Sequence, residues 1–73
     1  MTLLSKIKPG RKVLIKKMTA EGKLVQRLMD LGLYPSLEVK IVRNAPLEDP
    51  MQIEIDGCNL SLRHEEADHV EIC

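Results

Sequence analysis

Hydrophobic and polar residues alternate with a period of two over most of this chain. From residue 37 onward, apolar side chains take every second position in four segments, and polar side chains fill the positions between them. This period buries one face of a strand and leaves the other in solvent, as in antiparallel sheets. A fifth segment is short, contains β-branched residues and is bounded by turn residues. We therefore predict strands at residues 12–18, 37–41, 51–56, 59–63 and 69–72.

One segment, residues 22–32, has a helical period instead. Its apolar side chains recur at steps of three and four, and polar side chains fill the opposite face. Gly32 accepts the left-handed conformation that ends helices, so Leu33 is expected to fold back on the last turn. The hydroxyl of Thr19 is expected to cap the start of the helix. The apolar positions are Leu24, Val25, Leu28, Met29 and Leu31.

Turn-forming residues separate these segments. Asp56-Gly57 lies between two alternating segments and predicts a tight hairpin. Residues 45–50 form a longer loop, whose two prolines keep it out of a sheet ladder. Residues 64–68 predict a polar connection with one helical turn. Residues 1–10 predict an apolar helical turn or a covering strip that ends at a Pro-Gly turn.

Five short strands and one helix within 73 residues indicate a single domain, residues 1–73. The strands are too few and too short for two full sandwich sheets. Closing them into a small, strongly bent barrel removes exposed edges. We predict a mainly β fold, a five-stranded SH3-like barrel with one short α-helix between its first and second strands.

Composition excludes several function classes. Eleven basic residues balance eleven acidic ones, whereas nucleic-acid binders are usually basic. With one Tyr, no Phe and no Trp, the chain lacks both base-stacking platforms and the aromatic groove that binds proline-rich peptides. No apolar run approaches the roughly 20 residues that span a membrane, and the N-terminus is not typical of a secretory signal. We therefore predict a cytoplasmic protein that binds no nucleic acid, does not insert into membranes and keeps its cysteines reduced.

Candidate metal ligands are sparse. The soft ligands are Cys58, His64, His69 and Cys73, and only the two histidines fit the paired spacing of structural zinc sites, loosely. We predict no metal site and no resident cofactor, because this spacing does not support Fe²⁺ binding; a weak surface site is the alternative. No serine, histidine and carboxylate show the convergence that nucleophilic catalysis needs, so we predict no catalytic residue and no enzyme.

Two surface features leave alternatives open. The predicted helix and its exit carry six large apolar side chains, which either all belong to the core or partly form an exposed patch for a partner. Charges also cluster, either as solvated residues or as patches for a partner of opposite charge. The basic cluster is Arg11, Lys12, Lys16, Lys17 and Lys23, and the acidic cluster is Glu65, Glu66 and Asp68.

Four ordered segments carry a family resemblance. Residues 27–35 have the pattern R-L-x-x-L-G-L-x-P, and residues 43–50 have the pattern R-x-A-P-x-x-D-P. Residues 60–67 have the pattern L-x-L-R-x-x-E-A, and Ile7-Lys8-Pro9-Gly10 is similar to L-x-P-G. These patterns, in this order and across nearly the whole chain, resemble the FeoA family.

Two positions depart from the family pattern. Ser36 follows Pro35 where the family usually has Gly. A type II turn there would need a positive φ, so with Ser we expect another turn type. Glu48 stands where the proline loop commonly carries Gly, and it adds a charge to that loop. Neither departure alters the pattern of core positions.

The resemblance implies a function. FeoA proteins are small cytosolic SH3-like barrels that accompany FeoB, a membrane ferrous-iron transporter with a cytosolic GTPase domain, and they have no established enzymatic activity. We therefore expect an accessory or regulatory protein of ferrous iron uptake that acts by binding the cytosolic part of FeoB. The alternative is a transition-metal chaperone or sensor that binds Fe²⁺. A monomer is expected, with a weak dimer as the alternative.

The expected partner surface is the predicted helix and its exit. Leu28 and Leu33 are expected to supply apolar contact, and Tyr34, the one aromatic residue, to act as an anchor. The charges of Lys23 and Arg27 are expected to steer an acidic partner. The predicted partner-binding residues are Lys23, Arg27, Leu28, Leu31, Leu33 and Tyr34.

Overall fold

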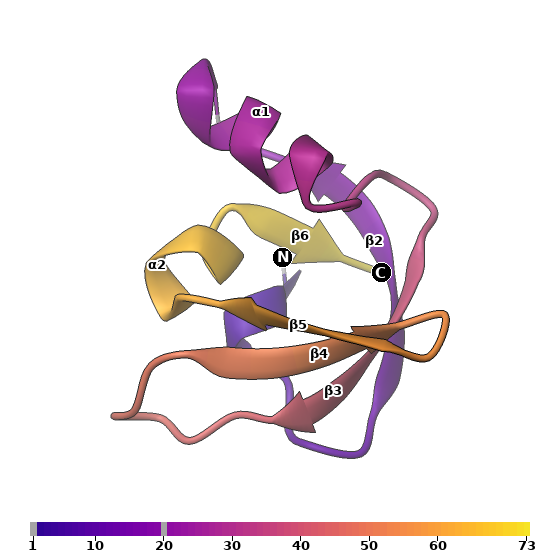
Figure 1. Cartoon of the computed structure of the whole chain (residues 1–73), viewed down its shortest axis with the longest axis vertical. Helices are drawn as coiled ribbons and strands as arrows, with labels where there is room; N and C mark the ends of the chain where they lie inside the picture. The colour runs from indigo at the N-terminus through magenta and orange to yellow at the C-terminus, as the bar shows by residue number, and fades with distance from the viewer. Residues whose placement is uncertain (1, 20) are drawn as a thin grey trace.

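A computed structural model describes residues 2–19 and 21–73 (Figure 1). All strand pairs in it are antiparallel, and the strand order is β1-β6-β2-β3-β4-β5. The strands are β1 (Thr2–Leu3), β2 (Lys12–Met18), β3 (Glu38–Arg43), β4 (Met51–Ile55), β5 (Cys58–Leu62) and β6 (Val70–Ile72). The helices are the 3₁₀ turn η1 (Leu4–Lys6), α1 (Lys23–Asp30) and α2 (His64–Ala67).

Strand β2 joins the two halves of the barrel. Its first part pairs with β3, and its second part pairs with β6. The register shifts between Ile15 and Lys17, and such a bulge bends a strand and increases its twist. This bend lets one strand belong to both halves of the barrel, which gives the SH3-like form predicted from the sequence.

The predicted strand count of five is wrong, because the described residues form six strands. The additional strand, β1, has only two residues, and it pairs with β6 at the opposite end of the chain. Two residues are too few to show alternation, so only the tertiary pairing reveals this strand. The helix α1 consequently lies between the second and third strands, not between the first and second.

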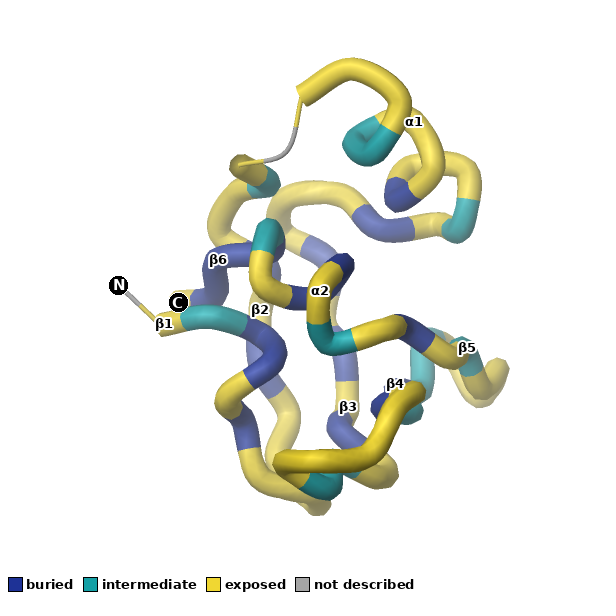
Figure 2. The backbone as a smooth tube through the Cα atoms, turned by 90° about the vertical axis from the view of Figure 1, so that its left-hand side faces the viewer, coloured by how far each residue is buried: buried dark blue, intermediate teal, exposed yellow. Residues whose placement is uncertain are grey.

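The core follows the predicted alternation along the strands. Figure 2 shows buried segments along the strands and mostly exposed backbone in α1. Glu71 is an exception, since the sequence pattern places it on the wet face of β6, whereas it is buried. The strand lies between β1 and β2, and the amines of Lys16 and Lys17 lie 3.7 and 3.9 Å from the Glu71 carboxylate. The most deeply buried large side chains are Leu4, Ile15, Leu28, Leu33, Val39, Ile41, Met51, Ile53, Leu62 and Val70.

The C-terminus of α1 forms as predicted. Gly32 has a φ of +98°, and the amide of Gly32 donates to the Met29 carbonyl at 2.9 Å. The amide of Leu33 donates to the Leu28 carbonyl at 3.1 Å, which completes a Schellman motif. The predicted cap at the N-terminus is wrong, because the N-cap residue is Gly22 and the Thr19 hydroxyl donates to the His69 carbonyl.

The turn after α1 also differs from expectation. Leu37 N donates to Tyr34 O at 3.2 Å, and Ser36 between them has a φ of +79°. A proline at the second position and a positive φ at the third are the features of a type II turn. The turn that glycine would favour therefore forms with serine in its place, at a conformational cost of about 1 kcal/mol.

The other predicted connections are present. Asp56 and Gly57 both have positive φ and close the tight hairpin between β4 and β5. The connection before β6 contains the short helix α2, as predicted. Within the described part of the chain, no helix combines the length and apolar character needed to cross a membrane.

Candidate functional site

The predicted partner surface lies at the end of the barrel that α1 covers (Figure 1). Met29 and Tyr34 are its largest exposed apolar side chains, at 53% and 51% exposure, and Leu31 between them is half-buried. Lys23 and Arg27 are exposed on the same element. We define the α1 surface by these residues, Lys23, Arg27, Met29, Leu31 and Tyr34.

Leu28 and Leu33 are not part of this surface, and their predicted contact with a partner is wrong for the folded chain. Both side chains are completely buried. Leu28 lies on the side of α1 that faces the barrel, and the Schellman motif turns Leu33 back beneath the helix. They hold α1 on the barrel.

Met29 is an exposed residue of this surface that was not among the predicted partner-binding residues. The helical period placed it in the same apolar arc as Leu28. The structure divides that arc, because Leu28 is buried, Leu24, Val25 and Leu31 are half-buried, and Met29 is exposed. The sequence left open whether all six apolar side chains belong to the core; in the structure, part of the arc remains exposed.

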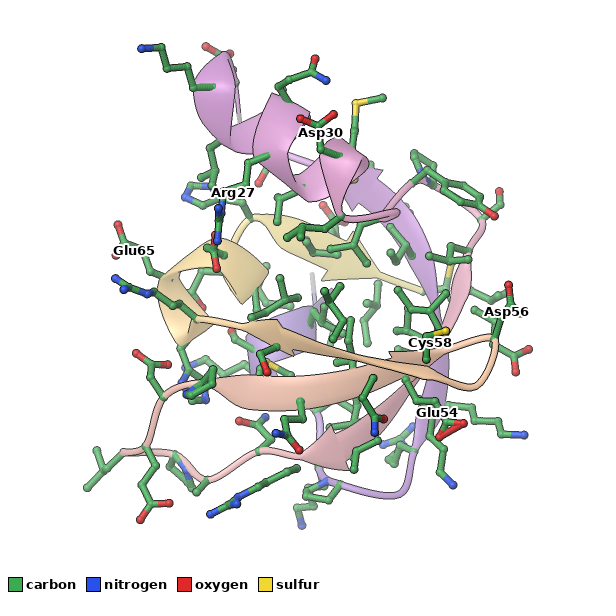
Figure 3. All side chains as sticks on the ribbon, viewed as in Figure 1. Arg27, Asp30, Glu54, Asp56, Cys58 and Glu65 are labelled. Carbon is green, nitrogen blue, oxygen red and sulfur yellow. The ribbon has the colours of Figure 1, made fainter. Side chains whose placement is uncertain are left out.

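Arg27 links α1 to α2. Its Nε lies 2.5 Å from Oε2 of Glu66, a residue 39 positions away, and the arginine side chain remains 62% exposed (Figure 3). The other carboxylate oxygen of Glu66 accepts the backbone N–H of Arg63 at 3.0 Å. The Arg27 hydrogen bond and then the Arg63 backbone hydrogen bond lower the pKa of Glu66 below its usual range. Arg27 thus has a structural role in addition to its predicted role in steering.

A groove of about 410 Å³ runs between the two helices beside this ion pair. It is lined by Leu24, Arg27, Arg63, Glu65 and Glu66. Its walls carry both signs of charge, and the buried Glu66 is already satisfied by Arg27 and Arg63. The groove therefore adds a polar edge to the α1 surface. The mixed charges of this edge favour neither an acidic nor a basic ligand strongly.

Members of both predicted charge clusters form ion pairs within the fold, in each case with a residue outside the two clusters. Lys16 and Lys17 of the basic cluster both approach Glu71, and Glu66 of the acidic cluster pairs with Arg27. Opposite charges near the two ends of the chain meet because β6 pairs with β2. Lys23, which belongs to the α1 surface, keeps its exposed charge.

The four candidate metal ligands are spread over the molecule. Cys58 and Cys73 are exposed free thiols. The ring of His64 is hydrogen-bonded on both sides, by Asp49 and Asn44, and His69 accepts through its carbonyl from Thr19. Among residues 2–19 and 21–73, no three His, Cys, Asp or Glu side chains form a group that could hold a metal ion.

Comparison with known proteins identifies relatives that match nearly the whole chain. The family model described as FeoA domain matches residues 2–72. A fusion protein of Porphyromonas gingivalis, "Fe(2+) transport protein A/Fe(2+) transporter FeoB", is 30% identical over 69 residues. That match covers 94% of this chain and only 8% of the fusion protein.

Solved structures agree with this fold. The solution structure of iron(II) transport protein A from Clostridium thermocellum is 38% identical, with a TM-score of 0.89, over 97% of this chain and 44% of that one. A zinc complex of Stenotrophomonas maltophilia FeoA, described as a prokaryotic SH3 domain protein, is 22% identical with a TM-score of 0.86. The match covers 100% of this chain and 91% of that one, and at this identity it supports the SH3-like fold alone.

Proposed function

The chain belongs to the FeoA domain family, and on this premise we propose that it is an accessory protein of ferrous iron uptake that binds the cytosolic part of a FeoB-type transporter. The observation that carries the proposal is the relative in which FeoA and FeoB segments form one polypeptide. Covalent fusion holds two modules at high effective concentration, which favours contact between them. The proposed location is the cytoplasmic face of the membrane, reached through the partner.

The α1 surface supplies the proposed contact. Tyr34 and Met29 are half-exposed, and a tyrosine offers a large, rigid contact area at low entropic cost. Leu31 adds a half-buried apolar side chain from the same segment, Lys23 adds an exposed positive charge at the start of α1, and Arg27 remains exposed although it pairs with Glu66. Such an arrangement suits a partner patch with an apolar centre and an acidic rim.

The proposal assigns the chain a binding role and no catalytic step. It requires neither a resident metal nor a nucleic-acid partner, and the chain acts as a monomer without entering the bilayer. The alternative, an Fe²⁺ chaperone or sensor, predicts micromolar Fe²⁺ binding that is lost when both His64 and His69 are replaced by alanine. An anaerobic Fe²⁺ titration of the purified chain separates the two functions.

Binding to the isolated cytosolic domain of a FeoB transporter, measured by calorimetry, tests the surface. We expect Tyr34→Ala to weaken binding about tenfold, because truncating a central interface aromatic typically costs more than 1 kcal/mol. Met29→Ala should have a smaller effect in the same direction.

Leu47→Ala is the matched control, since Leu47 is an apolar side chain that is 98% exposed on the opposite loop. It should bind as the wild type does. Equal binding by wild type, Tyr34→Ala and Met29→Ala would contradict the assignment of the α1 surface. Absence of binding by the wild type would contradict the proposed function itself.

A further inference from the structure

A second polar corner lies away from the α1 surface, where the loop of residues 44–50 meets α2 and the N-terminal segment. A cavity of about 340 Å³ opens there, and its walls include Asn44, Pro46, His64 and Asp68. Hydrogen bonds cross this corner between residues far apart in the sequence. None of them belongs to the proposed partner surface.

The orientation of the Asn44 side chain follows from two backbone acceptors. Its Nδ2 donates to the carbonyl oxygens of Ser5 at 3.0 Å and of Ile7 at 2.8 Å. The reversed amide would place its oxygen against both carbonyl oxygens, which is repulsive. Oδ1 of Asn44 therefore faces His64, and it can only accept a hydrogen bond there.

Asp49 faces the other side of the same imidazole ring. Its Oδ1 accepts the backbone N–H of His64 at 2.8 Å and lies 2.5 Å from His64 Nδ1. The backbone hydrogen bond from His64, followed by the side-chain one, lowers the pKa of Asp49 below its usual value of 3.8. At neutral pH Asp49 is an ionised carboxylate, and it too can only accept.

His64 therefore lies between two acceptors. Its Nε2 is 2.6 Å from Oδ1 of Asn44, and its Nδ1 contacts Asp49. A neutral imidazole carries one N–H and can satisfy one of these acceptors, whereas an imidazolium carries two and satisfies both. We propose that His64 is a pH-responsive latch, which in its doubly protonated form fastens the loop of residues 44–50 to α2.

Other charged groups around the latch have both signs. Lys6 and Lys8 line the same cavity and disfavour a further positive charge, while Asp68 of the same cavity favours it. Asp68 also accepts a hydrogen bond from the Ser5 hydroxyl. The positive charge of Arg63, at the start of α2, contributes to the lowered pKa of Asp49. The surrounding charges are thus of both signs, and the two direct hydrogen bonds are the contacts that differ between the neutral ring and the imidazolium.

The loop that the latch is proposed to hold, residues 44–50, has an exposed apolar side chain at its tip. Leu47 is 98% exposed, and within the loop the amide of Glu48 donates to the carbonyl of Ala45 at 3.1 Å. Because only the imidazolium donates to both acceptors, the latch is expected to hold the loop more firmly at pH 6 than at pH 8.

Two NMR measurements on the full chain test this inference. The ¹⁵N shifts of the His64 ring should show protons on both nitrogens at pH 6. Hydrogen exchange of the Glu48 and His64 amides, corrected for intrinsic rates, should be about tenfold faster at pH 8 than at pH 6. In His64→Gln the exchange should already be fast at pH 6 and should not change with pH.

Controls separate the latch from general effects of pH. His69→Gln should keep the pH dependence of the wild type, because no ring nitrogen of His69 takes part in the hydrogen bonds of this corner. Asp49→Asn should reduce the dependence, because an amide can donate to the neutral ring. A single protonated ring nitrogen at pH 6, or wild-type exchange that is constant from pH 6 to pH 8, would overturn the proposal, even if His64→Gln failed to fold.

Discussion

The two α-helices of this chain are held in different ways. In α1, one of eight residues is buried, Leu28, and the helix keeps most of its surface in solvent (Figure 2). In α2, two of four residues are buried, Glu66 and Ala67. The shorter helix is thus the more deeply embedded of the two.

The N-terminal ends of the two helices differ as well, and that of α2 is again the better supported. Among the residues that the structure describes, no side chain caps the start of α1, where the N-cap residue is Gly22. At the start of α2, the Glu66 carboxylate accepts the Arg63 amide and at the same time pairs with Arg27 of α1. The period and the glycine stop of α1 are local features, and the buried Leu28 and Leu33 hold this helix on the barrel. The short helix α2 is completed by the ion pair of Glu66 with Arg27. The comparison indicates that α1 covers one end of the barrel and presents a surface to solvent, whereas α2 has a structural role.

The largest expected effect comes from the anchor of α1. Leu28→Ala should lower the free energy of unfolding by about 2–5 kcal/mol, since it removes a fully buried leucine and leaves a cavity. Urea denaturation followed by circular dichroism measures this loss. The neighbouring control Met29→Ala, at an exposed position, should stay within about 0.5 kcal/mol of the wild type. Comparable losses in both variants would show that α1 packs differently.

Removing the ion pair between α1 and α2 should have the next largest effect on the free energy of unfolding. Glu66→Gln removes the charge that Arg27 and the Arg63 amide share, and we expect a loss of about 1–2 kcal/mol. Solvent screening at the exposed Arg27 keeps the ion-pair part of this loss small. Glu65→Gln, at the adjacent exposed position, serves as the control and should change the unfolding free energy by less than about 0.5 kcal/mol. Equal unfolding free energies of Glu66→Gln and Glu65→Gln would contradict a stabilising role for the contacts of Glu66 with Arg27 and the Arg63 amide.

Acid should weaken the contacts that Glu66 and Asp49 make at α2. The pKa values of Glu66 and Asp49 are lowered in the folded state, so the unfolded chain binds more protons as the pH falls. Their contribution is present above the ordinary values of 4.5 and 3.8 and is lost as the pH falls through the lower folded-state values. Unfolding free energies measured from pH 7 to pH 2 should decline below about pH 4.5. The gap between wild type and Glu66→Gln should shrink over the same range, and a gap independent of pH would contradict the assignment to Glu66.

The smallest effect is a gain in stability at the exit of α1. Ser36→Gly should raise the free energy of unfolding by about 0.5–1 kcal/mol, because Ser36 has a φ of +79°, which glycine adopts without strain. Thermal denaturation detects the change. Ser61→Gly is the matched control, because Ser61 lies in β5, where glycine weakens the strand by a similar amount. A loss of stability in Ser36→Gly would show that the strain is absent.

Much of the fold could be predicted from local patterns. Strand β2, the Asp56-Gly57 hairpin and the Gly32 stop are short-range features, because each depends on side chains and backbone angles of neighbouring residues. Strand β1 and the burial of Glu71 could not be predicted in this way. They result from pairing between the two ends of the chain, which no local period encodes.

The candidate site was predictable only in part. The helical period identified the apolar arc of α1, and the family motif identified its exit. The period could not show that Leu28 would be covered and Met29 exposed, because the angle at which a helix docks decides which edge of the arc faces the barrel. Leu33 of the helix exit was also predicted to contact a partner, although the glycine stop turns this side chain into the core.

The sequence by itself determined the period of each segment, the positions of most turns and the membership of the FeoA domain family. Only the tertiary structure decided which charges meet. Arg27 and Glu66 are 39 residues apart, and His64 and Asp49 are 15 apart. The reason is physical: backbone conformation depends on near neighbours, whereas a hydrogen bond between distant side chains exists only after the sheet has bent and brought them within about 3 Å of each other.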